Sequence, residues 1–97
     1  MAETTQKIYA TIYTYDPERS EDLARLRPQH REFLRSLFDA GKLLASGPYA
    51  DGKALIVVRA DSADGAYQML DPDPLNEAHI ILHREASEWK PVIGPWD

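Results

Sequence analysis

The chain has 97 residues, of which 43% are apolar and 28% charged, an ordinary composition for one globular domain. Sixteen acidic against eleven basic side chains give a net charge of −5, so we expect neither nucleic acid nor an anionic membrane as a partner. Cysteine is absent, which excludes disulfides, thiolate metal sites and a cysteine nucleophile.

No targeting or membrane-spanning segment is visible in the sequence. No apolar run approaches the ~20 residues that a membrane helix needs, and Met1–Lys7 lacks the apolar stretch of a signal peptide. We therefore expect a cytoplasmic protein that forms a single domain over residues 1–97, with an ordered core of about 7–92 and a frayed N-terminus.

The first predicted element is a strand over Lys7–Tyr15, because its residues alternate and are rich in β-branched and aromatic types. One face carries aliphatic side chains and the other carries tyrosines and a threonine. Asp16-Pro17 ends the strand, and Glu18–Arg25 is expected to be a charged connection.

A helix is predicted from about Arg27 to Ala40, where the apolar period becomes helical. Pro28 suits a first helical turn, in which its missing N–H is not needed, and Gly41 suits the C-terminal cap. The apolar stripe of this helix consists of Phe33, Leu34, Leu37 and Phe38.

The remaining predicted elements follow in chain order. A short strand over Leu43–Tyr49, a turn at Asp51-Gly52 and an apolar strand over Ala54–Ala60 form a hairpin. A second helix is capped by Asp61 or Ser62 and ends near Leu70, and one more helical turn is expected at Leu75–Ala78. The last strand is predicted over His79–Lys90.

The order of elements is βαββαβ, which predicts an α+β, ferredoxin-like antiparallel sheet with both helices on one face. The third strand is apolar on both faces, and the first strand places tyrosines opposite its aliphatic face. The uncovered sheet face therefore needs a partner, and a second copy of the chain is the simplest one. The alternative is a half-solvated monomer with exposed tyrosines.

This topology brings distant segments to one end of the sheet. The first helix should begin where the second helix finishes and where the second strand ends. His30 begins the first helix, Asp73 follows the second, and Ser46–Tyr49 closes the second strand, so we expect these three segments to meet.

His30 and Asp73 are the residues best suited to carry chemistry. His30 shares the inward face of its helix with Phe33 and Leu34, and an inward histidine needs a polar partner. A carboxylate bonded to one ring nitrogen leaves the other nitrogen available as a base. The alternative is that the pair only joins two segments of the fold.

Other polar residues could position a ligand. Arg27, one turn before His30, could hold a carboxylate or pair with an acidic neighbour. Ser46 could donate a hydrogen bond, and Gly47-Pro48 offers a rigid bend with close backbone approach. His79 could line the same pocket.

No metal site is expected. His79 and His83 would share a strand face but lie about 13 Å apart, too far for one ion. None of the common phosphate-binding, dinucleotide-binding or zinc-protease motifs is present.

Three short motifs resemble the YciI-like family, also called the YCII-related domain. They are Arg27-x-x-His30, the run from Gly41 through Leu43-Leu44-Ala45-Ser46 to Gly47-Pro48, and Asp73-Pro74, within a similarity over roughly Lys7 to Val92. The resemblance implies a dimeric α+β barrel with an active site around a histidine–aspartate pair. It also implies proton transfer without a cofactor on a small oxygenated ring compound, as in dehydrochlorination or lactone isomerisation.

The principal hypothesis is therefore a cofactor-independent enzyme of lyase or isomerase type. His30 would act as general acid or base and Asp73 would orient it, while Arg27, Ser46, Gly47, Pro48 and His79 would bind the small-molecule substrate. A non-catalytic binding or oligomerisation module is the alternative, since a fold alone does not determine a function. A haem-binding or oxygen-using barrel is a third and weaker possibility.

Overall fold

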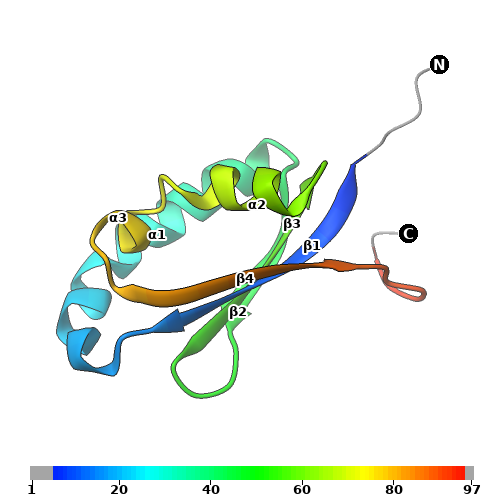
Figure 1. Ribbon diagram of the computed structural model, residues 1–97. Coiled ribbons are helices and arrows are strands. Elements are labelled where there is room, and N and C mark those ends of the chain that lie inside the picture. The colour runs from blue at the N-terminus through cyan, green and yellow to red at the C-terminus, as the bar shows by residue number, and fades with distance from the viewer. Residues whose placement is uncertain (1–5, 96–97) are drawn as a thin grey trace.

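A computed structural model describes residues 6–95. Its four strands form one antiparallel sheet in the order β2-β3-β1-β4, with the helices on one face (Figure 1). This is the predicted ferredoxin-like α+β architecture. The elements are β1 (Lys7–Tyr15), the short 3-10 helix η1 (Pro17–Arg19), α1 (Ser20–Asp39), β2 (Leu43–Pro48), β3 (Lys53–Ala60), α2 (Ala63–Leu70), α3 (Pro74–Glu77) and β4 (Ile81–Trp89).

The N-terminal segment expected to be frayed lies, up to residue 5, outside the described residues. Among residues 6–95, no helix combines the length and the apolar character needed to cross a bilayer.

The core lies between the helices and one face of the sheet, and on β1 this is the face that carries tyrosines. Tyr9, Thr11 and Tyr13 are buried, whereas the aliphatic residues between them are only partly covered. The open face of β1 is therefore aliphatic, not tyrosine-rich as expected for a half-solvated monomer. The reason is that the helical layer supplies the polar partner that a buried tyrosine hydroxyl needs.

Helix α1 begins at Ser20, seven residues before the predicted start, so the expected charged connection is helical. Asp22 accepts hydrogen bonds from Arg19 and Arg25, and its negative charge in the first turn suits the helix dipole. Pro28 therefore lies inside the helix, and His30 lies near its middle instead of at its start. Pro28 and Ala24 are both exposed, so the backbone group that proline leaves unpaired is on the solvent side.

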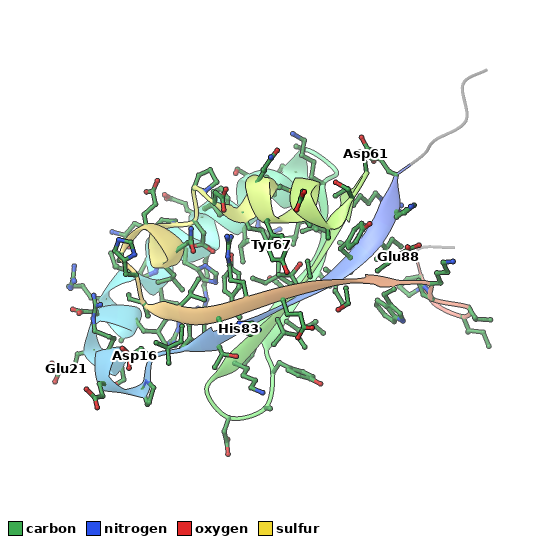
Figure 2. All side chains as sticks on the ribbon, viewed as in Figure 1. Asp16, Glu21, Asp61, Tyr67, His83 and Glu88 are labelled. Carbon is green, nitrogen blue, oxygen red and sulfur yellow. The ribbon has the colours of Figure 1, made fainter. Side chains whose placement is uncertain are left out.

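The second helical segment follows the prediction closely. Ser62 caps α2 by accepting a hydrogen bond from the Gly65 amide. Tyr67 projects from α2 toward the sheet, where its hydroxyl accepts a hydrogen bond from the Ala86 amide at 2.8 Å (Figure 2). This contact ties α2 to β4.

Chain direction places the C-terminal ends of β1 and β2 at the same end of the sheet, because each pairs antiparallel with β3. Figure 1 shows η1, the start of α1 and α3 gathered at that end. The predicted segments therefore meet at one end of the sheet, but α1 contributes its middle and not its start.

Candidate active site

Asp73 occupies the short connection between α2 and α3 and is completely buried. Its amide donates to the Leu70 carbonyl, and its carboxylate caps α3 by accepting a hydrogen bond from the Leu75 amide at 3.0 Å. Pro74 follows as the first helical residue, where a proline fits. The capping geometry and the fully buried Leu70 and Leu75 fix the carboxylate in place.

His30 points from α1 at this carboxylate. Its Nδ1 lies 2.8 Å from Oδ2 and 3.0 Å from Oδ1 of Asp73, and the residue is only 8% exposed. The other ring nitrogen, Nε2, makes no hydrogen bond to any of residues 6–95. A carboxylate beside Nδ1 favours the tautomer that carries its proton there, which leaves the Nε2 lone pair available.

Tyr13 is the third member of this cluster. Its hydroxyl donates to Oδ2 of Asp73 at 3.0 Å, and the side chain is fully buried. Burial, with the neighbouring Asp73 charge and hydrogen bond, raises the pKa of Tyr13 far above its ordinary value. Asp73 thus faces three donors, the pattern of an ionised, acceptor-only carboxylate.

A cavity of about 440 Å³ lies beside His30, between α1 and the β2–β3 hairpin. This size is typical of small-molecule sites. Its wall on α1 is a single helical stripe, and the opposite wall comes from the ends of β1, β2 and β3. The lining residues are Tyr15, Leu23, Arg27, His30, Arg31, Leu34, Ser46, Gly47, Pro48, Ala50, Gly52, Lys53, Ala54 and Ile56.

Tyr15 supplies a neutral donor at this cavity. Burial and the charge of Asp73 raise the pKa of Tyr15 to about 12, although Arg27 acts in the opposite direction. The phenol therefore keeps its proton at neutral pH.

Most of the residues predicted to position a ligand line this cavity. Arg27, Ser46, Gly47 and Pro48 all contribute to its wall together with His30. Arg27 pairs with neither of the acidic residues considered as partners, because Asp22 binds two other arginines and Asp73 binds His30 and Tyr13.

His79 does not line the cavity, in contrast to the prediction. It lies before β4, which begins at Ile81, and its backbone adopts a left-handed φ of 60°. The buried Ile80 anchors the chain here, and Arg19 binds the carbonyls of Ala78 and His79. His79 is exposed and lies in a tight turn that the strand pattern did not reveal.

The sequence argument missed four residues of the site: Tyr13, Tyr15, Arg31 and Lys53. The tyrosines could have been found, because β1 ends where the predicted site lies. Arg31 stands one turn after Arg27 on the same helix face. Lys53 is the first residue of β3 and follows the turn that connects β2 to β3.

Among residues 6–95, no group of three or more histidine, aspartate or glutamate side chains is placed to hold a metal ion. The groups available for chemistry are an imidazole, a phenol and cationic side chains around an apolar wall.

The YCII-related domain matches residues 8–90, and the chain belongs to this family. No curated protein matches the sequence. Solved structures do resemble the fold. One is the 5-chloro-2-hydroxyhydroquinone dehydrochlorinase of Burkholderia phenoliruptrix AC1100, in complex with 2,5-dihydroxybenzoquinone. It is 17% identical with a TM-score of 0.74, and the match covers 86% of this chain and 93% of that one.

Two more distant structures share the architecture. A candidate antibiotic biosynthesis monooxygenase from Bacteroides thetaiotaomicron is 12% identical with a TM-score of 0.58, covering 95% of this chain and 94% of that one. A NIPSNAP family protein from Agrobacterium tumefaciens is 13% identical with a TM-score of 0.56, covering 95% and 90%. At these identities the likeness concerns the fold.

Proposed function

We propose that this chain is a cofactor-independent enzyme of lyase or isomerase type, in which His30 transfers a proton on a small oxygenated ring compound. The observation that carries the proposal is the buried Asp73 carboxylate within 2.8 Å of Nδ1, while His30 also lines a cavity of ligand size. Asp73 orients the ring and stabilises the imidazolium that forms when Nε2 accepts a proton.

The cavity argues against a purely structural pair. A histidine that only joined two segments would be packed on all sides, whereas this one lies at the wall of an accessible space of about 440 Å³. Ser46 and the backbone at Gly47-Pro48 would position the substrate opposite the imidazole, and Arg27 would hold a negatively charged oxygen.

The similarity to the 5-chloro-2-hydroxyhydroquinone dehydrochlorinase suggests the first reaction to test. The name of that enzyme describes removal of chloride from a chlorinated hydroxyquinol, a reaction in which a base takes a proton and chloride leaves with the bonding electrons. The net change is loss of HCl, which requires no redox partner.

The test is chloride release from 5-chloro-2-hydroxyhydroquinone by the full chain and by His30→Gln. We expect the variant to lose at least a hundredfold in turnover, since positioned acid–base groups contribute about 10²–10⁴-fold. His83→Gln is the matched control, because His83 is an exposed histidine on β4. A measurable wild-type rate that His30→Gln retains would refute the role of His30, and absence of chloride release by the wild type would exclude this compound as a substrate.

A second copy of the chain is also proposed to cover the open face of the sheet. None of the helices within residues 6–95 packs there (Figure 1), and paired apolar residues run across its centre. In the β1–β3 register, Ala10 pairs with Val57 and Ile12 pairs with Leu55. Val57 is already buried, whereas Ala10, Ile12 and Leu55 are only partly buried. A partly exposed aliphatic surface of this kind favours a homodimer or a larger assembly.

A further inference from the structure

The cavity beside His30 has a charge opposite to that of the whole chain. The protein carries sixteen acidic and eleven basic residues, yet Arg27, Arg31 and Lys53 line the cavity and no aspartate or glutamate of residues 6–95 does. An acidic protein that gathers three of its cations around one cavity has a local field that attracts anions.

The side chains of these three cations have no anionic partner within the described chain. Arg19, Arg25 and Arg84 each bind a carboxylate at 2.8 to 3.0 Å. The side chains of Arg27, Arg31 and Lys53, like those of some other surface cations, make no hydrogen bond or ion pair with any of residues 6–95. Their mutual repulsion would be relieved by an anionic guest, which supplies the missing partner.

The placement of the three side chains defines where the anion would lie. Arg27 and Arg31 are four residues apart on α1, so they are stacked on the cavity side of the helix with His30 between them in sequence. Lys53 begins β3 on the opposite wall. An anion between these walls lies beside the imidazole and within reach of the protonated Tyr15.

The remaining lining residues describe the body of the ligand. Leu23, Leu34 and Ile56 make this part of the cavity apolar, which suits a ring or short hydrocarbon body. Helix α1 contributes residues from Leu23 to Leu34 and not its N-terminal amides, the usual cradle of a phosphate group. Planar guanidinium groups match both carboxylates and phosphates in geometry, so the absence of the N-terminal amides of α1 from the cavity is what favours a carboxylate.

We propose that the substrate is a small organic carboxylate with a compact apolar body, and that Arg31 and Lys53 select it by charge. This inference rests on the proposed function, because it concerns the same cavity, and it narrows the substrate from oxygenated compounds in general to carboxylate anions.

Calorimetric binding of benzoate to the full chain tests the inference, with neutral benzamide and with phenyl phosphate as comparison ligands. We expect benzoate to bind at least tenfold more tightly than either, and its affinity to fall as salt is added. Absence of benzoate binding at millimolar concentration, or equal binding of benzamide, overturns the proposal. Tighter binding of phenyl phosphate overturns it in favour of a phosphate ester.

Single substitutions locate the effect in the cavity. Arg31→Gln and Lys53→Gln should each weaken benzoate binding about tenfold, which corresponds to about 1.4 kcal/mol. Lys42→Gln is the matched control, because Lys42 is an exposed lysine at the far end of α1, outside the cavity. If Arg31→Gln and Lys53→Gln behave like Lys42→Gln, the selection does not reside in these residues.

A histidine variant separates this inference from the proposed function. His30→Gln should still bind benzoate, since the cations remain, even when it no longer catalyses proton transfer. A fully active His30→Gln with cation-dependent benzoate binding would refute the catalytic role alone. Normal dependence of turnover on His30 without any anion preference would refute the carboxylate class alone.

Discussion

Asp73 makes hydrogen bonds to three donors from three different segments. Tyr13 of β1, His30 of α1 and the Leu75 amide of α3 all point at its two oxygens. Because the residue is completely buried, any change in its acceptor capacity leaves donors unsatisfied in a low dielectric. The carboxylate therefore links the stability of the fold to the orientation of the imidazole.

Replacing Asp73 by asparagine tests both roles. Asp73→Asn removes the negative charge and one acceptor, so we expect turnover to fall by about 10²–10⁴-fold and the free energy of unfolding by about 1–3 kcal/mol. Steady-state kinetics and urea denaturation measure the two effects. Asp71→Asn, at an exposed aspartate that pairs with Arg84, is the control. Unchanged turnover in Asp73→Asn would contradict the account.

The two tyrosines at the end of β1 predict a loss of stability in alkali. The pKa of Tyr15 is raised to about 12 and that of Tyr13 is raised further, against about 10 in an unfolded chain. Above pH 10 the unfolded chain therefore binds fewer protons than the native state, and the free energy of unfolding falls as pH rises.

Urea denaturation at pH 8, 10 and 11 should reveal this slope. Tyr13→Phe and Tyr15→Phe should each make the slope shallower, because each removes one proton that only the native state retains. Tyr49→Phe, at an exposed tyrosine, controls for the loss of a hydroxyl group. A slope that stays the same in both of the first two variants would contradict the assigned pKa directions.

Among the elements, α1 departs most from its sequence pattern. Proline normally marks a first helical turn, yet the helix runs for twenty residues with Pro28 inside it. Leu23, from the turn before Pro28, lines the cavity, so the additional turns at the N-terminus extend the wall of the site. The helix continues through Pro28 because the α1 residues that line the cavity face the β2–β3 hairpin, while Pro28 faces solvent.

Pro28→Ala is expected to stabilise the protein. The substitution restores a backbone donor to an exposed helical turn. Alanine is favoured over proline in a helix interior by about 3 kcal/mol. The greater conformational freedom of the unfolded variant offsets about 1 kcal/mol of this gain. The expected gain is about 2 kcal/mol in the free energy of unfolding, measured with urea. A loss of stability would show that the packing of α1 requires the proline.

Structural features that depend on neighbouring residues in the sequence could be predicted, whereas features that depend on contacts between distant residues could not. The α2 cap, expected at Asp61 or Ser62, the hairpin and the order of elements along the chain depend on local patterns, and these were predicted. The position of Tyr13 at the end of β1 could have been predicted, but its hydrogen bond to Asp73 could not, because that carboxylate lies sixty residues away in the sequence. His79 was misplaced for a similar reason: the left-handed turn at this residue is fixed by the packing of Ile80 and has no signal such as glycine.

In the molecule as a whole, the two faces of the sheet differ in burial: the helices cover one face and leave the other open. The helix-facing residues of β3, such as Ile56 and Val58, are fully buried, whereas Ile12 and Leu55 on the open face remain partly exposed. The sequence predicted an uncovered face, and only the monomer alternative placed tyrosines on it, since alternation alone does not tell which face is inside.

Ile12→Lys tests the proposed assembly of copies through this face. A charge at the centre of an apolar interface costs far more than it does in water, so we expect the variant to sediment as a monomer while the wild type sediments as a dimer or larger species. Phe38→Lys is the control, an apolar-to-lysine change at an exposed residue of α1. A monomeric wild type would contradict the assembly.

We propose that Asp73 holds the His30 imidazole with an unprotonated Nε2 available for proton transfer, and ¹⁵N NMR of the ring tests this without knowledge of the substrate. At pH values where His30 is neutral, we expect the proton on Nδ1, and we expect Asp73→Asn to change this tautomer or its chemical shifts. A proton on Nε2 in the wild type, or identical spectra for the two proteins, would contradict the claim.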